Sequence, residues 1–578
     1  MNREIDPDEI FIDSETSSQF DADQFEGRLE KAISKPALFS VAVFFILIVI
    51  IFLGRLSILQ IKNAPKYAAL SENNSLKSTP IFSARGVIYD RNNVELAWNA
   101  PAQKSVDNAA LAAAAVASTT ATSTVEHYGD GDSDVPDRVY ANIPGVAHTV
   151  GYVQYPSKDT AGFYYKEDFT GLDGAEKYFD QQLQGENGLR LIEVDVHNKI
   201  QSKNTVRPAK EGGSVQLSID SRVEGALYNS IADVAQRVGF SGGAGIIMDV
   251  HTGEVLAETS YPEYNSQIMS SKSDNTLIRS YLTNKNRPFL DRVSSGLYTP
   301  GSIIKPYVAL GALNENIIDP NTVIQGVPYI SIPNPYDKTK STIFRDWQAQ
   351  GPEDMRKAIQ MSSDVYFYEI GGGYQGQKGL GINLIEKYTS LFGFGSAISK
   401  SFFAGSAGTI PSPAWKAANF AGESWYLGDT YHTAIGQYGF QVTPAQVVRA
   451  VAGIANGGTL INPTIVKGDQ GVVVGQVNLP AADFQVVKEG MHLSAHIGVA
   501  KALNVPFVDI AAKSGTAELG ASKANVNSWI TGFWPYNNPK YAFAVIMENG
   551  SVHNLVGAAA VFLETINWMN VNTPEYFK

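Results

Sequence analysis

Ser302 and Lys305 are two side chains whose types and spacing suit nucleophilic catalysis by a hydroxyl group. Pro300-Gly301 predicts a turn directly before them, and the apolar run Ile303–Leu313 predicts a helix. A serine and a lysine three residues apart lie on one face of a helix, so the amine can take the proton from the hydroxyl. A single S-x-x-K pattern is weak evidence, because it usually marks a helix-capping serine and an unrelated surface lysine.

Two further short motifs follow in the chain, and each alone is a weak signal. Ser362-Ser363-Asp364 precedes the aromatic run Val365–Gly371, which is predicted to be a helix. Lys513-Ser514-Gly515-Thr516 ends the run Val508–Lys513, which is predicted to be a strand. The three motifs, in this order and in these contexts, together form a strong signal for a serine enzyme. A G-x-S-x-G match at Gly239–Gly243 lacks the strand-then-helix context of a nucleophile elbow and is predicted to be a turn.

An amine accepts a proton from serine only when it is neutral. This requires its pKa to fall from ~10.4 to about 7, or about 4–5 kcal/mol of destabilisation of the charged form. Partial burial of Lys305 and a nearby Lys513 ammonium would supply it. An ionised Asp364 beside Lys305 would oppose it. Two arrangements stay open: Asp364 faces backbone or substrate donors, or Ser362 relays the proton.

The composition removes several other classes of function. The 578-residue chain carries a net charge of −12 and has no cysteine. The acidic balance argues against nucleic acid as a partner. Without thiols there are no disulfides, thiol nucleophiles or cysteine-type zinc sites, and the eight histidines show no metal-binding spacing. We therefore predict no metal and no cofactor.

The segment Ala37–Gly54 is apolar, with Ser40 its only polar side chain. As a helix it is about 27 Å long, close to the ~30 Å of a bilayer core. We predict an uncleaved membrane anchor at 37–58, after an acidic, disordered tail at 1–36. Basic residues flank both ends almost equally, and we expect the tail inside and the large domain outside.

The remaining pattern mixes strands and helices. Paired short apolar runs with polar turns between them predict hairpins, and helical runs separate these sets, which predicts an α+β antiparallel sheet covered by helices. The stretch at 109–124 is rich in Ala, Ser and Thr and is predicted to be a linker. A change of composition near Glu211-Gly212-Gly213 predicts a domain boundary. The predicted strands are 81–96 (two), 214–220, 243–250, 255–260, 525–535 and 541–549, and the predicted helices are 171–188, 221 onward and 558–571.

The sequence resembles the class B penicillin-binding proteins, and within them the elongation type, penicillin-binding protein 2. The resemblance covers nearly everything after the anchor. The three short motifs resemble the family's S-x-x-K, S-x-N/D and K-T/S-G-T. The further matching segments are Arg85–Asn92, Gly151–Val153, Gly171–Gly188, Gly243–Asn265, Asn286–Pro306, Phe344–Trp347, Ala434–Gln446 and Ile454–Gly458.

The resemblance implies an N-terminal transmembrane helix, a β-rich pedestal at 59–211 and a transpeptidase domain at 212–578 with a β-lactamase-like fold. It implies a peptidoglycan D,D-transpeptidase of cell elongation, acylated by β-lactams. Ser302, Lys305, Ser362, Asp364 and Lys513 would be catalytic. The backbone N–H groups of residues 302 and 516 would form the oxyanion hole, and the terminal carboxylate would be bound by Lys513, Ser514, Gly515 and Thr516.

The implied partners are peptidoglycan stem peptides, β-lactams, a polytopic glycosyltransferase and proteins of the elongation complex. The implied location is the bacterial inner membrane, with one span and an extracytoplasmic catalytic domain. Two other classes stay open: a membrane-anchored β-lactam sensor or hydrolase, and a catalytically silent scaffold of cell-wall assembly.

The sequence departs from the family pattern at several positions. Asn93 and Tyr438 stand where glycine is usual, and Asp364 stands where Asn is commoner. The Gly-His-Gly that often follows the FRDW-like segment is absent, with Gln350-Gly351-Pro352 nearby. A zinc site of the kind found in relatives is therefore not expected.

Overall fold

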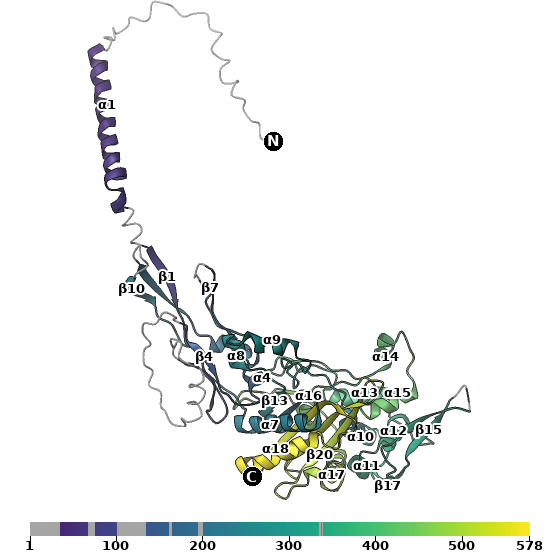
Figure 1. The fold of residues 1–578 in the computed structure, drawn as a ribbon. Helices are drawn as coiled ribbons and strands as arrows, with labels where there is room; N and C mark the ends of the chain where they lie inside the picture. The colour runs from purple at the N-terminus through teal and green to yellow at the C-terminus, as the bar shows by residue number, and fades with distance from the viewer. Residues whose placement is uncertain are drawn as a thin grey trace, which may run out of the picture. The chain divides into compact units, whose positions relative to one another are not determined.

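The structure is a computed structural model that describes residues 35–67, 75–100, 135–160, 164–194, 200–334, 337 and 339–578. The predicted acidic tail lies almost wholly, and the linker at 109–124 wholly, outside these residues. The chain forms two compact units, residues 1–79 with 191–204 and residues 80–190 with 205–578. Figure 1 shows the course of the chain through both.

The first unit contains the predicted anchor. Helix α1 (Lys35–Ser57) continues as a short π-helix, η3 (Ile58–Lys62). Residues Leu38–Lys62 are long and apolar enough to cross a membrane, and they are the one such stretch among the described residues. None of this stretch is buried, as expected of a helix whose apolar side chains face lipid. Most of a sheet of order β1-β9-β10 also belongs here, with strands Ser75–Ile81, Gly188–Val194 and Ile200–Arg207.

The N-terminal part of the second unit is built on a sheet of order β11-β2-β3-β4. The predicted turn between β2 and β3 is confirmed, and Asn93 adopts the positive φ of 65° expected of it. Arg85 and Arg138 are fully buried and both bind the carboxylate of Glu176, at 2.6 and 2.7 Å. The elements here are β2 (Ile88–Tyr89), β3 (Glu95–Ala100), β4 (Asp137–Tyr140), α4 (Ala147–Val150), β5 (Val153–Gln154), β6 (Ser157–Lys158), β7 (Tyr164–Lys166), β8 (Thr170–Gly171), α5 (Gly174–Tyr178), α6 (Asp180–Leu183) and β11 (Val215–Gln216).

The predicted antiparallel sheet is confirmed, with the order β13-β12-β22-β21-β20. The strands are β12 (Gly242–Asp249), β13 (Val255–Tyr261), β20 (Ala511–Leu519), β21 (Asn525–Trp534) and β22 (Tyr541–Ser551). Alternate residues of β22 enter different cores: Phe543 and Val545 pack with α7 (Ser221–Val238) and α18 (Ala558–Asn572), whereas Ala544 and Ile546 pack with α16 (Pro444–Ala455). A sheet buried on both faces explains why these strands are apolar almost throughout.

The G-x-S-x-G match is a turn, as predicted. Gly239 ends α7 in the left-handed conformation, with φ 80°, and strand β12 follows. The remaining elements complete the described part of the second unit. They are α8 (Ser266–Ser271), α9 (Asn275–Thr283), η4 (Gly301–Ile304), α10 (Lys305–Asn314), β14 (Ile324–Gly326), β15 (Tyr329–Pro333), β16 (Ser341–Arg345), β17 (Gly351–Glu353), α11 (Met355–Met361), α12 (Asp364–Gly372), α13 (Ile382–Leu391), α14 (Pro413–Asn419), α15 (Leu427–Ala434), β18 (Thr459–Ile461), β19 (Val473–Gln476), α17 (Ala481–Ile497), η5 (Lys501–Leu503) and η6 (Pro574–Phe577).

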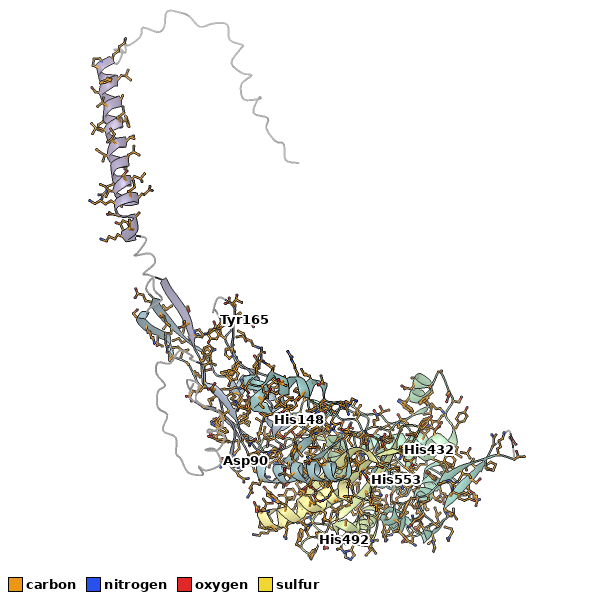
Figure 2. The ribbon with its side chains drawn as sticks, in the orientation of Figure 1. Asp90, His148, Tyr165, His432, His492 and His553 are labelled. Atoms are coloured by element: carbon orange, nitrogen blue, oxygen red, sulfur yellow. The ribbon has the colours of Figure 1, made fainter. Side chains whose placement is uncertain are left out.

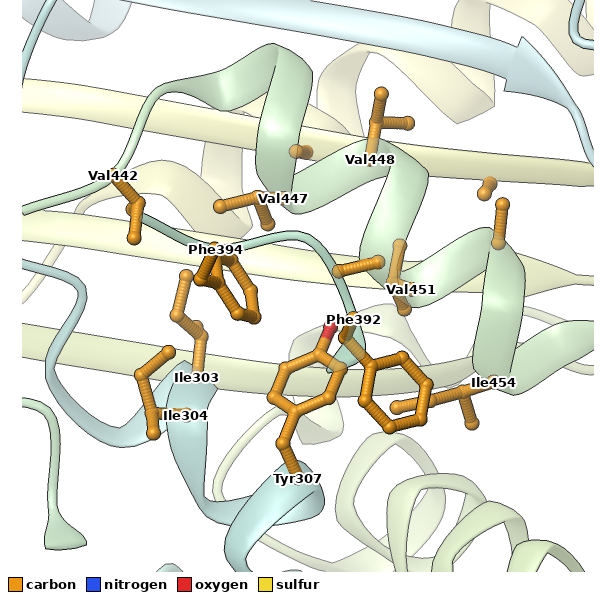
Figure 3. Close-up of a cluster of buried hydrophobic side chains, with 14 of the residues drawn as sticks. Ile303, Ile304, Tyr307, Phe392, Phe394, Val442, Val447, Val448, Val451 and Ile454 are labelled. Carbon is orange, nitrogen blue, oxygen red and sulfur yellow. The ribbon is translucent and has the colours of Figure 1, made fainter. Parts of the chain in front are cut away.

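The turn that carries Ser302 rests on a dense apolar core (Figure 3). Ile303, Ile304 and Tyr307 are almost completely buried. The ring of Tyr307 contacts those of Phe392 and Phe394, with centroids 4.8 and 5.0 Å apart. Close packing of this kind fixes side-chain and backbone positions, so the backbone that carries Ser302 and Lys305 is held rigidly.

Candidate active site

Ser302 lies in η4, a single 3₁₀ turn that leads directly into α10. Pro306 in the first turn of α10 has a φ suited to a helix start. Gly301 has a φ of +57°, and a Cβ atom there would lie 2.6 Å from the carbonyl oxygen of Thr516. Only glycine fits this position, which brings the Ser302 turn against strand β20.

Strand β20 forms the edge of the sheet next to η4. A Cβ atom at Gly515 would lie 2.8 Å from the carbonyl oxygen of Pro300, so this glycine also allows the close approach. The indole of Trp529, on the neighbouring strand, donates to the carbonyl of Thr299 at 3.0 Å. The predicted strand ending at Lys513 is wrong in its limits: β20 begins at Ala511 and continues to Leu519, so the whole motif lies within the strand.

Ser362 lies between helices α11 and α12, and its backbone is strained. Its φ of 57° and ψ of 39° are left-handed, a conformation that costs a non-glycine residue about 1–2 kcal/mol. Ser363 then caps α12, its hydroxyl accepting from the N–H of Tyr366 at 3.2 Å. The tight connection directs the Ser362 hydroxyl toward both lysines.

The two predicted lysines and the second motif converge. Lys305 Nζ donates to the Ser362 carbonyl at 2.7 Å and contacts its hydroxyl at 3.4 Å. Lys513 Nζ donates to the same hydroxyl at 2.8 Å and to the Ser514 carbonyl at 2.8 Å. Both amines are completely buried, whereas Ser302 is partly exposed and Thr516 is exposed. Ser362 Oγ therefore connects the two buried lysines.

Asp364 determines the charge balance of this cluster. Its carboxylate binds Lys305 Nζ at 2.6 Å, so it does not face backbone or substrate donors, the first of the two predicted arrangements. Burial lowers the pKa of Lys513 well below its ordinary value, and the charge of Lys305 lowers it further. A lowered pKa is therefore found at Lys513, the lysine on the strand. The contact of Ser362 Oγ with both amines leaves the second arrangement, the relay, as a prediction.

A contact that the sequence did not predict supports the Ser362 turn from behind. Asp346 follows strand β16, and its carboxylate accepts from the Ser363 hydroxyl at 2.9 Å and from the Val365 N–H at 3.0 Å. The sequence showed Asp346 only as part of the FRDW-like segment, with no indication of its partners. Burial lowers the pKa of His432, which is labelled in Figure 2, and carboxylates that include that of Asp364 oppose this shift. A cavity of about 420 Å³ lies elsewhere, lined by residues that include Ser331, Tyr374 and Tyr431, so it does not coincide with the lysine cluster.

The comparisons with known proteins agree with this geometry. The family model described as "Penicillin binding protein transpeptidase domain" matches residues 243–566. The chain belongs to the penicillin-binding protein transpeptidase family. A second model, "Penicillin-binding Protein dimerisation domain", matches residues 132–217 of this penicillin-binding protein.

Similar curated proteins and solved structures share this architecture. The peptidoglycan D,D-transpeptidase MrdA of Salmonella typhimurium is 29% identical, over 86% of this chain and 90% of its own. MrdA of Acinetobacter baumannii is 27% identical, over 90% and 86%. The crystal structure of Pseudomonas aeruginosa PBP2 in complex with WCK 5153 is 27% identical, with a TM-score of 0.67 over 86% and 98% of the two chains. PBP2 of Helicobacter pylori, in a complex with MreC, is 25% identical, with a TM-score of 0.66 over 87% and 100%. The predicted family and fold class are confirmed.

The departures of this penicillin-binding protein from the family pattern have local structural consequences. Tyr438 adopts a φ of 61°, so it keeps the left-handed backbone that suits the usual glycine. Its ring packs against Trp415, Phe420 and Trp425. Across the described part of the chain, no three His, Asp or Glu side chains are arranged to hold a metal ion.

Proposed function

We propose that this chain is a peptidoglycan D,D-transpeptidase that acts through an acyl-enzyme on Ser302. The observation that carries the proposal is the contact of Lys305 and Lys513 with one hydroxyl, that of Ser362, beside the Ser302 turn. Membership of the family and the names of the relatives support the reaction class. The serine mechanism and the residue roles are inferred from the geometry.

In the first stage, Ser302 Oγ attacks the carbonyl carbon of the penultimate D-Ala of a stem peptide. The C–O bond of the ester forms, the amide C–N bond breaks, and the terminal D-Ala leaves with a proton on its amine. In the second stage, an amine from another stem peptide attacks the ester. A new amide forms and Ser302 recovers its proton, which leaves the two peptides cross-linked.

The proton of Ser302 needs an acceptor at the moment of attack. Lys305 is paired with Asp364, whereas burial favours neutral Lys513, and Ser362 connects the two amines. A substrate carboxylate bound by Ser514, Thr516 and Lys513 would stabilise a Lys513 ammonium. We infer that substrate binding itself favours transfer of the proton from Ser302 through Ser362 to Lys513.

The same geometry suits the other predicted roles. The N–H groups of residues 302 and 516 would stabilise the oxyanion, and one such donor contributes about 3–4 kcal/mol. Strand β20 is an edge strand, so an extended peptide can bind along it by main-chain hydrogen bonds. A β-lactam placed there would acylate Ser302 through its strained amide.

The decisive experiment is mass spectrometry of the full chain in detergent after incubation with a penicillin, with peptide mapping of the adduct. We expect one adduct, on Ser302, and none on Ser302→Ala. An adduct elsewhere, or specific labelling of the variant, would remove Ser302 from the mechanism. No adduct on the wild-type chain would favour the silent scaffold, and rapid hydrolysis of the adduct would favour the sensor or hydrolase class.

We further propose a role in cell elongation, with the chain anchored in the inner membrane and the catalytic domain outside. The support is the apolar helix together with two structural neighbours, PBP2 of Helicobacter pylori in a complex with MreC and a peptidoglycan synthase complex that coordinates polymerization and crosslinking. The partners would be a polytopic glycosyltransferase and elongation-complex proteins. The domain limits, 37–58 for the anchor, 59–211 for the pedestal and 212–578 for the transpeptidase domain, remain part of this proposal.

A further inference from the structure

The turn formed by Ser362, Ser363 and Asp364 is the least favourable backbone in the proposed site, and it needs support from outside. Ser362 is left-handed without being glycine. Asp364 must stay on Lys305, and the Ser362 hydroxyl must stay on Lys513. A shift of this turn would move both contacts together.

Asp346 supplies such support from a different segment of the chain. Its Oδ2 atom accepts from both the Ser363 hydroxyl and the Val365 N–H, on either side of Asp364. A carboxylate that accepts backbone N–H at a helix N-terminus is stabilising, and here it also fixes where α12 begins. Trp347, the next residue, donates from its indole to the carbonyl of Met361 at 3.1 Å. The segment thus binds the turn on both flanks, before Ser362 and after Ser363.

Asp346 is also part of the electrostatic environment of the lysines. Burial raises the pKa of its carboxyl, and the charge of Lys305 partly offsets that rise. Burial raises the pKa of the Glu353 carboxyl to about 7, and the nearby Ser363 hydroxyl and the charge of Lys305 partly offset that rise. The charged groups around Asp346 are therefore Lys305, Asp364 and Glu353, with Lys357 beyond Glu353.

We propose that Asp346 is a positioning residue for the acylation reaction, which holds the Ser362–Asp364 turn so that its hydroxyl and carboxylate face the two buried lysines. The inference rests on the proposed function, because it concerns the same reaction. It adds a residue outside the three motifs and assigns it two effects. One effect is geometric, through the hydrogen bonds to Ser363 and Val365, and the other is the negative charge near Lys305.

The test measures the second-order rate of acylation by a fluorescent penicillin, from pH 5 to 9, on the full chain in detergent. Asp346→Ala loses both effects, and we expect acylation to fall about 10- to 100-fold, as small misplacements of catalytic groups do. Asp346→Asn keeps an acceptor oxygen but loses the charge. Because a nearby carboxylate stabilises an ammonium, its removal should move the acid limb of the pH profile to lower pH, by about half to one pH unit.

Asp354→Asn is the matched control. Asp354 caps α11, the helix before the turn, by accepting from the N–H of Lys357 at 2.9 Å, and it makes no contact with Ser362, Ser363 or Asp364. We expect it to lower the melting temperature without moving the pH profile. Ser363→Ala removes one of the two donors to Asp346, so the loss in the double variant with Asp346→Ala should be smaller than the sum of the two single losses.

The outcomes separate the inference from the proposed function. An unlabelled wild-type chain would overturn both. The positioning role alone would be overturned if the wild type is labelled and Asp346→Ala reacts equally fast. It would also be overturned if Asp346→Asn leaves the pH profile unchanged. The positioning role would likewise be overturned if Asp354→Asn lowers the acylation rate as much as Asp346→Ala does for the same fall in melting temperature.

Discussion

Two buried carboxyls far from the proposed site give the sharpest prediction about stability. Glu224 on α7 and Glu258 on β13 are almost completely buried. Both contact one hydroxyl, Thr149 Oγ1, at 2.5 and 3.0 Å. A hydroxyl has one hydrogen to donate, so at least one of the two carboxyls must be protonated and act as a donor. The second oxygen of each carboxyl is buried without a partner, which also favours a neutral form.

The sign and size of the effect follow from the pKa shifts. Burial raises the pKa of both carboxyls well above 4.5, and the charge of Glu258 raises that of Glu224 further. The folded state thus holds protons that the unfolded state releases. The stabilisation is fully present below pH ~4.5 and is lost as pH rises through the folded-state pKa, with a slope of about 1.4 kcal/mol per pH unit for each proton.

The perturbation is Glu258→Gln, which removes one titrating group and keeps a side chain of similar shape. Urea unfolding of the full chain at pH 6.5, 7 and 8 should show a smaller loss of unfolding free energy for the variant, by up to about 1.4 kcal/mol per pH unit. His148, labelled in Figure 2, precedes Thr149 in the chain, and burial lowers its pKa from 6.5. Its contribution to the pH dependence is common to the wild type and the variant, so it cancels in the comparison.

Exposed Glu211 provides the control, because Glu211→Gln changes the formal charge equally without altering a buried group. Its pH dependence should match the wild type. Identical slopes for wild type and Glu258→Gln would refute the argument, since they would mean that the Glu258 carboxyl is ionised in the folded state as it is in the unfolded state. The experiment does not depend on any enzymatic activity.

Four further changes test the proposed site and its frame. Lys513→Arg should reduce penicillin acylation at least 100-fold if a neutral amine takes the proton, because a guanidinium stays charged; near wild-type acylation would leave Lys513 as a carboxylate-binding group alone. Ser362→Gly should raise the unfolding free energy by up to about 1 kcal/mol, through relief of the left-handed strain, while acylation falls; equal acylation would exclude the relay. Gly515→Ala places a Cβ 2.8 Å from the Pro300 carbonyl and should slow acylation more than it lowers the melting temperature. Glu176→Gln, between two buried arginines, should destabilise the protein by about 3–5 kcal/mol in urea unfolding; a loss below 1 kcal/mol would show that the arginines find other partners.

The sheet was predictable because its strands are apolar runs bounded by turn residues, as in 243–250 and 541–549. Strands and turns of this kind are determined by neighbouring residues, so hydrophobic periodicity and glycine positions predict them. The limits of β20 were missed because Ser514 and Thr516 are polar. They lie in an edge strand at the proposed site, where the alternation of polar and apolar residues does not indicate which side chains are buried. The contacts of Asp346 could not be predicted either, since they depend on how a hairpin packs against a helix 19 residues further along the chain.

The arrangement of charge at the site illustrates the same limit. From residue types alone, the amine nearest the nucleophile was the natural candidate for neutrality. In the structure, that amine is paired with Asp364, whereas the amine on the strand is buried beside a positive charge and has no carboxylate within ion-pairing distance in the described residues. Protonating two lysines that contact one hydroxyl in a buried site costs free energy, because their positive charges repel each other. A carboxylate beside one of them favours the positive charge on that lysine. Asp364 binds Lys305 and not Lys513, and we propose that this contact sets how charge is shared between the two lysines. Replacing Asp364 with Asn would remove this preference, so that the bound substrate alone would determine which lysine is protonated.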